Sequence, residues 1–133
     1  MIDRLNIGGP THQVLLLTRD LKQRGYQTVL VKGQVAPGEE EMSDAIRRSG
    51  VQPLQFSGLS RAISPIDDLK SLWSLYRLIR RIRPDVVHTH KPKAGVVGRL
   101  AAWLAGVPVT VHTFHGHLLQ HYFPGWVSRL ILI

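Results

Sequence analysis

The sequence has no cysteine among its 133 residues, which excludes a disulfide framework and any cysteine-ligated metal site. No apolar run approaches the roughly 20 residues that a membrane-spanning helix needs. The N-terminus lacks the charged start and apolar segment of a signal peptide. Acidic residues are few, 9 against 17 lysines and arginines, so the formal net charge is +8. These absences favour a cytoplasmic protein whose partners carry negative charge.

The composition, with 44% hydrophobic residues, is that of one globular domain. The chain opens on a stub, residues 1–7, that fits the tail of a strand, and it stops inside the apolar run 130–133. A complete domain rarely ends on apolar residues that nothing covers. We therefore interpret residues 1–133 as an incomplete domain.

Hydrophobic spacing predicts alternating strands and helices. Strands are expected at 26–32, 51–56, 85–90 and 107–113, and helices between the 8–11 loop and Gly25 and at 39–49, 64–83 and 94–105. Pro53 weakens the second strand or places it at an edge. Together with the stub, this order predicts an α/β fold with a Rossmann-like parallel sheet flanked by helices.

Two predicted strands end in histidines: His88 and His90 on one, His112, His115 and His117 on or after the other. Ligands bind at the carboxyl ends of parallel strands, so these side chains indicate a site at one sheet edge. Zinc is a weak alternative because no carboxylate or cysteine accompanies them; structural histidines are another. Hydrogen bonding to sugar hydroxyls or phosphates fits best.

His115 is the sharpest catalytic candidate, because it follows an apolar strand and precedes a glycine, and histidine titrates near neutral pH. Spacing alone does not separate it from His117. An aromatic loop at 121–126 could stack on a sugar ring or pack beneath a lid.

The pair Gly8 and Gly9 precedes a helix, where backbone N–H groups could approach a phosphate, although a plain turn would need the same glycines. Lys91 and Lys93 stand at another helix start and indicate an anion site or two solvated lysines. The basic segment 77–83 could lie on an anionic membrane, or pack on the sheet with its arginines in water.

An ordered set of motifs resembles the N-terminal domain of family 4 glycosyltransferases, which are retaining enzymes of the GT-B architecture. The motifs are residues 8–11 (Gly-Gly-Pro-Thr), 83–90 (Arg-Pro-Asp-Val-Val-His-Thr-His), 94–95 (Ala-Gly), 98–102 (Gly-Arg-Leu-Ala-Ala), 106–109 (Gly-Val-Pro-Val) and 113–117 (Thr-Phe-His-Gly-His). The resemblance spans nearly the whole chain, and its specificity lies in the set and its order.

The resemblance implies two Rossmann-like domains that face each other across a cleft, of which the second holds the nucleotide-sugar. That second domain is absent from the chain, and most of the first strand is missing, so the chain alone is expected to be inactive. By resemblance, His115 would contact the transferred sugar, whereas Gly8, Gly9 and Thr11 would approach the donor diphosphate. Residues His90, Lys91 and Lys93 would border the acceptor, and the lysines suit a negatively charged one.

The expected function is therefore transfer of a sugar from a nucleotide-sugar to a polyol, sugar or lipid-linked acceptor in cell-envelope polysaccharide or glycolipid synthesis. No metal or cofactor is implied. Contact with an anionic membrane would place the protein at the inner membrane face. Alternatives are a nucleotide-sugar epimerase of the same architecture, although no acidic pair stands at these strand ends, and a non-catalytic basic module. Nucleic acid is disfavoured because no recognition helix or RNA-stacking pattern is present.

Overall fold

The computed structural model describes residues 1–56, 59 and 65–115. The helices are α1 (Gly9–Gln23), α2 (Ser43–Ser49), α3 (Pro65–Ile82) and α4 (Pro92–Ala105). The strands are β1 (Val31–Lys32), β2 (Leu54–Gln55), β3 (Val86–His90) and β4 (Val109–Thr113). This alternation confirms the predicted α/β class.

Within the described residues both strand pairs are parallel. β1 pairs with β2, and β3 pairs with β4 along five residues from Val86↔Val109 to His90↔Thr113. Between them lies the N-terminal stub, because Ile2 bridges Lys32 on one side and His90 on the other, both in parallel. The stub thus takes the central place in the order β2, β1, stub, β3, β4, as the tail of a first strand would.

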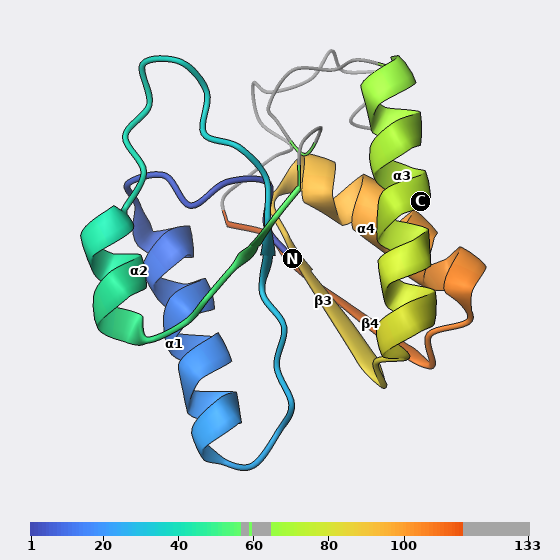
Figure 1. Cartoon of the computed structure of the whole chain (residues 1–133), viewed down its shortest axis with the longest axis horizontal. Coiled ribbons are helices and arrows are strands. Elements are labelled where there is room, and N and C mark those ends of the chain that lie inside the picture. The colour runs from blue at the N-terminus through green and yellow to red at the C-terminus, as the bar shows by residue number, and fades with distance from the viewer. Residues whose placement is uncertain (57–58, 60–64, 116–133) are drawn as a thin grey trace.

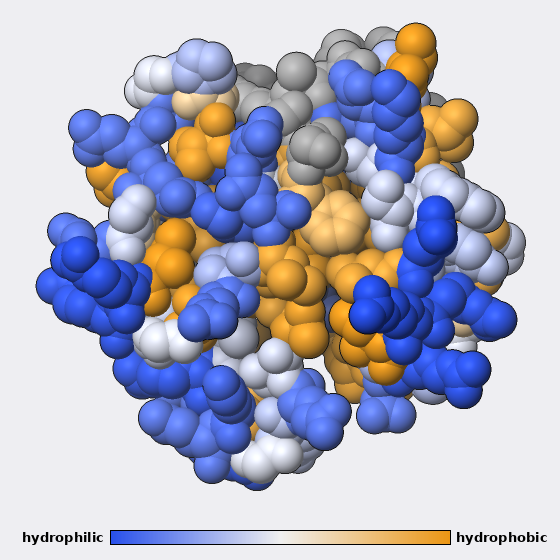
Figure 2. Space-filling model, viewed as in Figure 1, coloured by the Kyte–Doolittle hydropathy of each residue, from blue (hydrophilic) through white to orange (hydrophobic). Residues whose placement is uncertain are grey.

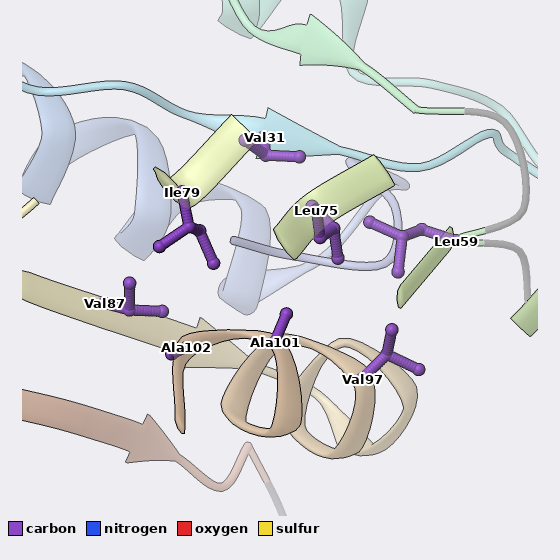
Figure 3. Packing of buried hydrophobic residues seen from close by; sticks show 8 residues of the cluster. All are labelled: Val31, Leu59, Leu75, Ile79, Val87, Val97, Ala101 and Ala102. Carbon is purple, nitrogen blue, oxygen red and sulfur yellow. The ribbon is translucent and has the colours of Figure 1, made fainter. Parts of the chain in front are cut away.

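Helices cover both faces of this sheet (Figure 1). On one face α3 and α4 pack together over the cluster in Figure 3: Val31, Leu59, Leu75, Ile79, Val87, Val97, Ala101 and Ala102. On the other face α1 and α2 cover a second cluster: Ile2, Leu5, Val14, Leu15 and Leu30, with Ala45, Ile46 and Val51 against it. This two-sided cover is the doubly wound arrangement of Rossmann-like sheets.

Small residues let α4 approach the sheet closely. A Cβ added at Gly98 would lie 2.8 Å from Thr89 Cγ2, and one added at Gly95 would lie 2.5 Å from His112 Cε1. Ala101 and Ala102 are fully buried on the same helix. The close approach fixes α4 over β3 and β4, so the N-terminus of the helix lies beside the strand ends.

Three sequence predictions differ at a boundary by three residues or more, and one of them is the strand expected at 51–56, which forms ladder pairs only at Leu54–Gln55. The strand expected at 26–32 forms ladder pairs only at Val31–Lys32, and the helix expected from residue 39 begins at Ser43. The acids before Ser43 act as long-range partners: Glu39 pairs with Arg4 at 2.9 Å, and Glu41 pairs with Lys32. These contacts hold the segment away from helical geometry.

Candidate functional site

The carboxyl ends of the central strands meet at one edge of the sheet. The loop after the stub, residues 4–8, leaves the sheet next to the end of β3, and α1 and α4 both begin in the upper half of Figure 1. The segment after β4 leads to His115 at the same edge. The structure therefore brings three loops together where the sequence predicted a site.

Three histidines gather on one face of this edge. His90 Nδ1 lies 2.9 Å from His115 Nε2, and the rings of His88 and His90 are 4.1 Å apart between centroids. His88 Nε2 lies 2.7 Å from the hydroxyl of Thr113 on the neighbouring strand. The alternation of side chains along β3 and β4 puts these groups on the same face.

His112 lies on the opposite face, beneath α4. Its Nδ1 is 2.9 Å from the hydroxyl of Thr89, and its ring packs against Gly95 and edge-on against Phe114 at 4.3 Å. Of the five imidazoles expected at one place, the structure brings together His88, His90 and His115, and it places His112 elsewhere. His117 and the aromatic loop 121–126 fall outside the described residues.

The clustered histidines are neutral near pH 7. The pKa of His90 is lowered to about 3, mainly by burial and next by the neighbouring ring of His88. Burial also lowers the pKa of His115, helped by the ammonium of Lys91 and opposed by Asp3. A neutral imidazole has one donor and one acceptor nitrogen, so in the contact between His90 and His115 one ring donates its N–H and the other accepts it.

The glycine turn leads directly into α1. Gly8 has a φ of 153°, and the helix begins at Gly9 with Pro10 in its first turn and no side-chain cap. A Cβ at Gly9 would meet nothing within 4 Å in the described structure. Thr11 is fully buried and donates from its hydroxyl to the carbonyl oxygen of Asn6 at 2.5 Å. The turn therefore offers open backbone N–H groups, whereas Thr11 braces the loop.

The two lysines at the start of α4 are engaged within the chain. Lys91 Nζ donates to Asn6 Oδ1 at 2.6 Å and to the carbonyl of Arg4 at 3.1 Å, and lies 3.5 Å from Asp3 Oδ1. Lys93 Nζ lies 2.6 Å from Asp68 Oδ1 on α3. Their predicted contact with an acceptor stays a prediction, and the structure gives both ammoniums partners of their own.

Sequence reasoning missed three contributors: Asp3, Asn6 and Thr113. The sequence did indicate two of them, because the polar residues Asp3 and Asn6 interrupt an apolar stub at the point where a strand ends. Among residues 1–56, 59 and 65–115, no group of three or more histidine or acidic side chains is arranged to hold a metal ion.

A parallel α/β sheet whose strand ends carry a glycine turn and converging polar side chains defines a Rossmann-like ligand-binding domain. The glycosyl transferase 4-like domain family matches residues 8–133, and the chain belongs to this family. No solved structure matches the chain.

Several curated relatives are glycosyltransferases. The chain is 45% identical over 100 residues to the UDP-Gal:alpha-D-GlcNAc-diphosphoundecaprenol alpha-1,3-galactosyltransferase of Escherichia coli, covering 75% of this chain and 24% of that protein. It is 34% identical over 130 residues to the UDP-N-acetylglucosamine–N-acetylmuramyl-(pentapeptide) pyrophosphoryl-undecaprenol N-acetylglucosamine transferase of Pseudomonas fluorescens. This match covers 94% of this chain and 35% of that protein. The capsular polysaccharide biosynthesis glycosyltransferase CapM of Staphylococcus aureus is 34% identical over 62 residues, which cover 47% of this chain and 16% of that protein. The chain thus spans about a quarter to a third of the length of the first two relatives.

Proposed function

We propose that the chain is the acceptor-side half of a retaining GT-B glycosyltransferase that moves a sugar from a nucleotide-sugar donor to a lipid-linked or polysaccharide acceptor. The observation that carries the proposal is the convergence of an uncapped glycine turn and a neutral histidine pair at one sheet edge. The family match and the names of the relatives favour the same reaction class. A second, nucleotide-binding domain would complete the site.

The donor diphosphate would meet the start of α1. Backbone N–H groups in the first turn have no partners inside the helix, and the helix dipole favours negative charge there. The open space around Gly9 leaves room for phosphate oxygens to approach the backbone. We assign Gly8 and Gly9 to this contact, with Thr11 bracing the turn through Asn6.

His115 would contact the transferred sugar. As a neutral imidazole tied to His90, it offers one fixed nitrogen as a hydrogen-bond partner for a hydroxyl or ring oxygen. Bond breaking at the anomeric carbon builds positive charge on the sugar and negative charge on the departing diphosphate. A neutral group near the carbon and N–H donors near the phosphate stabilise that separation by positioning and electrostatics.

The acceptor would lie along the end of β3, where the notable groups are His90, Lys91 and Lys93. Two relatives carry diphosphoundecaprenol or pyrophosphoryl-undecaprenol in their names, so an acceptor built on a polyprenyl diphosphate is the first to test. Lys93 could recognise its phosphates by exchanging the Asp68 carboxylate for them, whereas Lys91 would have to leave Asp3, Asn6 and the Arg4 carbonyl to do so.

The decisive experiment is a transfer assay with the full-length protein that contains this chain. Purified protein would be incubated with labelled UDP-galactose or UDP-N-acetylglucosamine and an N-acetylglucosaminyl polyprenyl diphosphate, and the lipid product identified by mass. Donor-dependent extension of the lipid supports the proposal. Interconversion of the nucleotide-sugar without an acceptor would support the epimerase alternative, and neither product with any donor would overturn both.

The outer side of α3 suits a membrane surface. Ile66, Leu69 and Trp73 are exposed in its first half, and Arg77 and Arg80 in its second half. Figure 2 shows strongly hydrophilic side chains beside the C-terminal end of α3, next to exposed hydrophobic surface. In the described part of the chain no helix is long and apolar enough to cross a bilayer.

Aromatic and basic groups on one helix face fit peripheral binding to anionic lipid at the cytoplasmic face. Flotation with vesicles of phosphatidylglycerol and phosphatidylcholine tests this part of the proposal. Binding that needs the anionic lipid and weakens with salt is expected, and equal binding to neutral vesicles would contradict it. Vesicle binding without any sugar transfer would instead favour the non-catalytic basic module.

A further inference from the structure

One ammonium group joins the end of β3 to the glycine loop. Lys91 immediately follows β3 in the chain, and its Nζ contacts three residues of the segment 3–6 that lie more than 80 positions away in sequence. Its side chain is 13% exposed and that of Asp3 is 6% exposed. A buried charge must be compensated by partners, so these contacts determine where the loop can lie.

The backbone at Lys91 supports the same interpretation. Its φ is 67°, in the left-handed region that residues other than glycine rarely adopt. Such a conformation persists only where surrounding contacts hold it in place. At Lys91 the hydrogen bonds to Asn6 and to the Arg4 carbonyl do so, at the position just before α4 begins.

Asn6 is held from two sides. Its side-chain oxygen accepts from Lys91, and its backbone oxygen accepts from the hydroxyl of Thr11 on α1. Gly8 and Gly9 lie between Asn6 and Thr11 in the sequence. The position of the glycine turn therefore depends on a link that runs from β3 through Lys91 and Asn6 to α1.

We propose that Lys91 is a positioning residue, which fixes the loop 4–8 and hence the Gly8–Gly9 turn at the sheet edge instead of binding the acceptor itself. The expected effect on catalysis depends on the proposed function, because the turn matters there as the donor-diphosphate site. The effect on the loop does not depend on it.

Lys93 provides a matched control. It lies two positions further along the chain, in the first turn of α4, its side chain is equally exposed at 13%, and it also pairs with an aspartate, Asp68. Asp68 is on α3, so this ion pair joins two helices and does not involve the glycine loop. Loss of either lysine removes one buried charge partner, but only Lys91 touches segment 3–6 in the described structure.

The test compares Lys91→Met and Lys93→Met in the full-length protein. Hydrogen exchange at the amide of Ile7, which donates to the Glu40 carbonyl at 3.3 Å, reports how firmly the loop is held in the absence of any ligand. We expect Lys91→Met to raise this exchange and the donor KM about tenfold each, as loss of charge-assisted hydrogen bonds predicts, with the acceptor KM unchanged. We expect Lys93→Met to leave the loop exchange and the donor KM at their wild-type values, whereas a rise in its acceptor KM would agree with the acceptor contact proposed for Lys93.

An increase in the acceptor KM with unchanged loop exchange would overturn the proposal in favour of direct acceptor binding. Equal loop exchange in both variants would overturn it as well. If Lys91→Met does not fold, Asn6→Ala replaces it, because it removes the hydrogen bond from Lys91 to Asn6 and leaves the ion pair between Lys91 and Asp3. Asn6→Ala should reproduce the faster loop exchange and the weaker donor binding. If the wild-type protein transfers no sugar, the proposed function fails, while the exchange result still decides the role of Lys91.

Discussion

Replacement of Gly9 by valine separates the contribution of the glycine turn to donor binding from its contribution to folding. Gly9 is the first residue of α1, its φ lies in the ordinary range, and an added Cβ would meet nothing within 4 Å. A side chain there is therefore tolerated by the fold. It would, however, fill the space that a phosphate needs to reach the helix N-terminus.

The expected magnitudes differ between the two readouts. Glycine costs about 0.5–1 kcal/mol relative to alanine inside a helix, and valine recovers part of this, so the free energy of unfolding should stay within about 0.5 kcal/mol of wild type. Donor binding should weaken by at least about tenfold, or about 1.4 kcal/mol, because hydrogen bonds from the first turn are lost. Calorimetric titration of the full-length protein with nucleotide-sugar and thermal melts in the same buffer measure both.

Gln23→Val is the matched control for this substitution. It places the same side chain at the exposed last position of α1, about 21 Å along the helix from Gly9 at 1.5 Å per residue. Donor affinity should be unchanged in Gln23→Val and intermediate in Gly9→Ala. Unchanged donor affinity in Gly9→Val, with the fold intact, would refute the assignment of the glycine turn to the diphosphate.

Three further predictions test the histidine cluster and the sheet. His115→Ala should lower kcat in the transfer assay about 100-fold with little change in melting temperature. Phe114→Ala, at the exposed neighbouring residue, should leave kcat unchanged. A near-wild-type kcat in His115→Ala would remove His115 from the reaction. Gly33→Ala should destabilise the protein by about 3 kcal/mol in urea unfolding, because its Cβ would lie 1.7 Å from the backbone oxygen of Leu59; a wild-type midpoint would contradict this packing. His90 stays neutral in the folded state down to pH about 3, while the unfolded chain protonates it below 6.5, so stability should fall by about 1.4 kcal/mol per pH unit as pH decreases through that window. His90→Asn should reduce this slope in urea titrations at several pH values, and a slope that does not change would refute the assignment.

The alternation of strands and helices along the chain, and the helices α3 and α4 in particular, followed from the sequence because their signals are local. Hydrophobic spacing marks α3 and α4, and β3 and β4 combine β-branched residues with a proline, Pro84 or Pro108, shortly before each strand. The strand expected at 26–32 was too long, since a ladder needs a partner. Its neighbour, β2, contributes only two residues after Pro53, which has no N–H to donate.

The site was predictable in its location but not in its internal pairing. Parallel strands deliver their loops to one edge, so the meeting of His90 and His115 follows from topology. The same reasoning cannot reveal that Lys91 turns toward Asp3 and Asn6, because no short-range pattern encodes a contact across more than 80 residues. Nor can it show that His112 lies beneath α4, which depends on the register between β3 and β4.

The distribution of charge links the site to its surroundings. At the sheet edge the basic groups are compensated, since Lys91 faces Asp3, Arg4 faces Glu39 and the histidines are neutral. An anionic donor would therefore be held mainly by hydrogen bonds from backbone N–H groups at the start of α1, and these act over distances well below the Debye length, so salt screens them weakly. The exposed arginines of α3, by contrast, present their charge to water. Raising the salt concentration should consequently weaken vesicle binding much more than donor binding, and equal slopes in the two titrations would contradict this division between the site and the outer face.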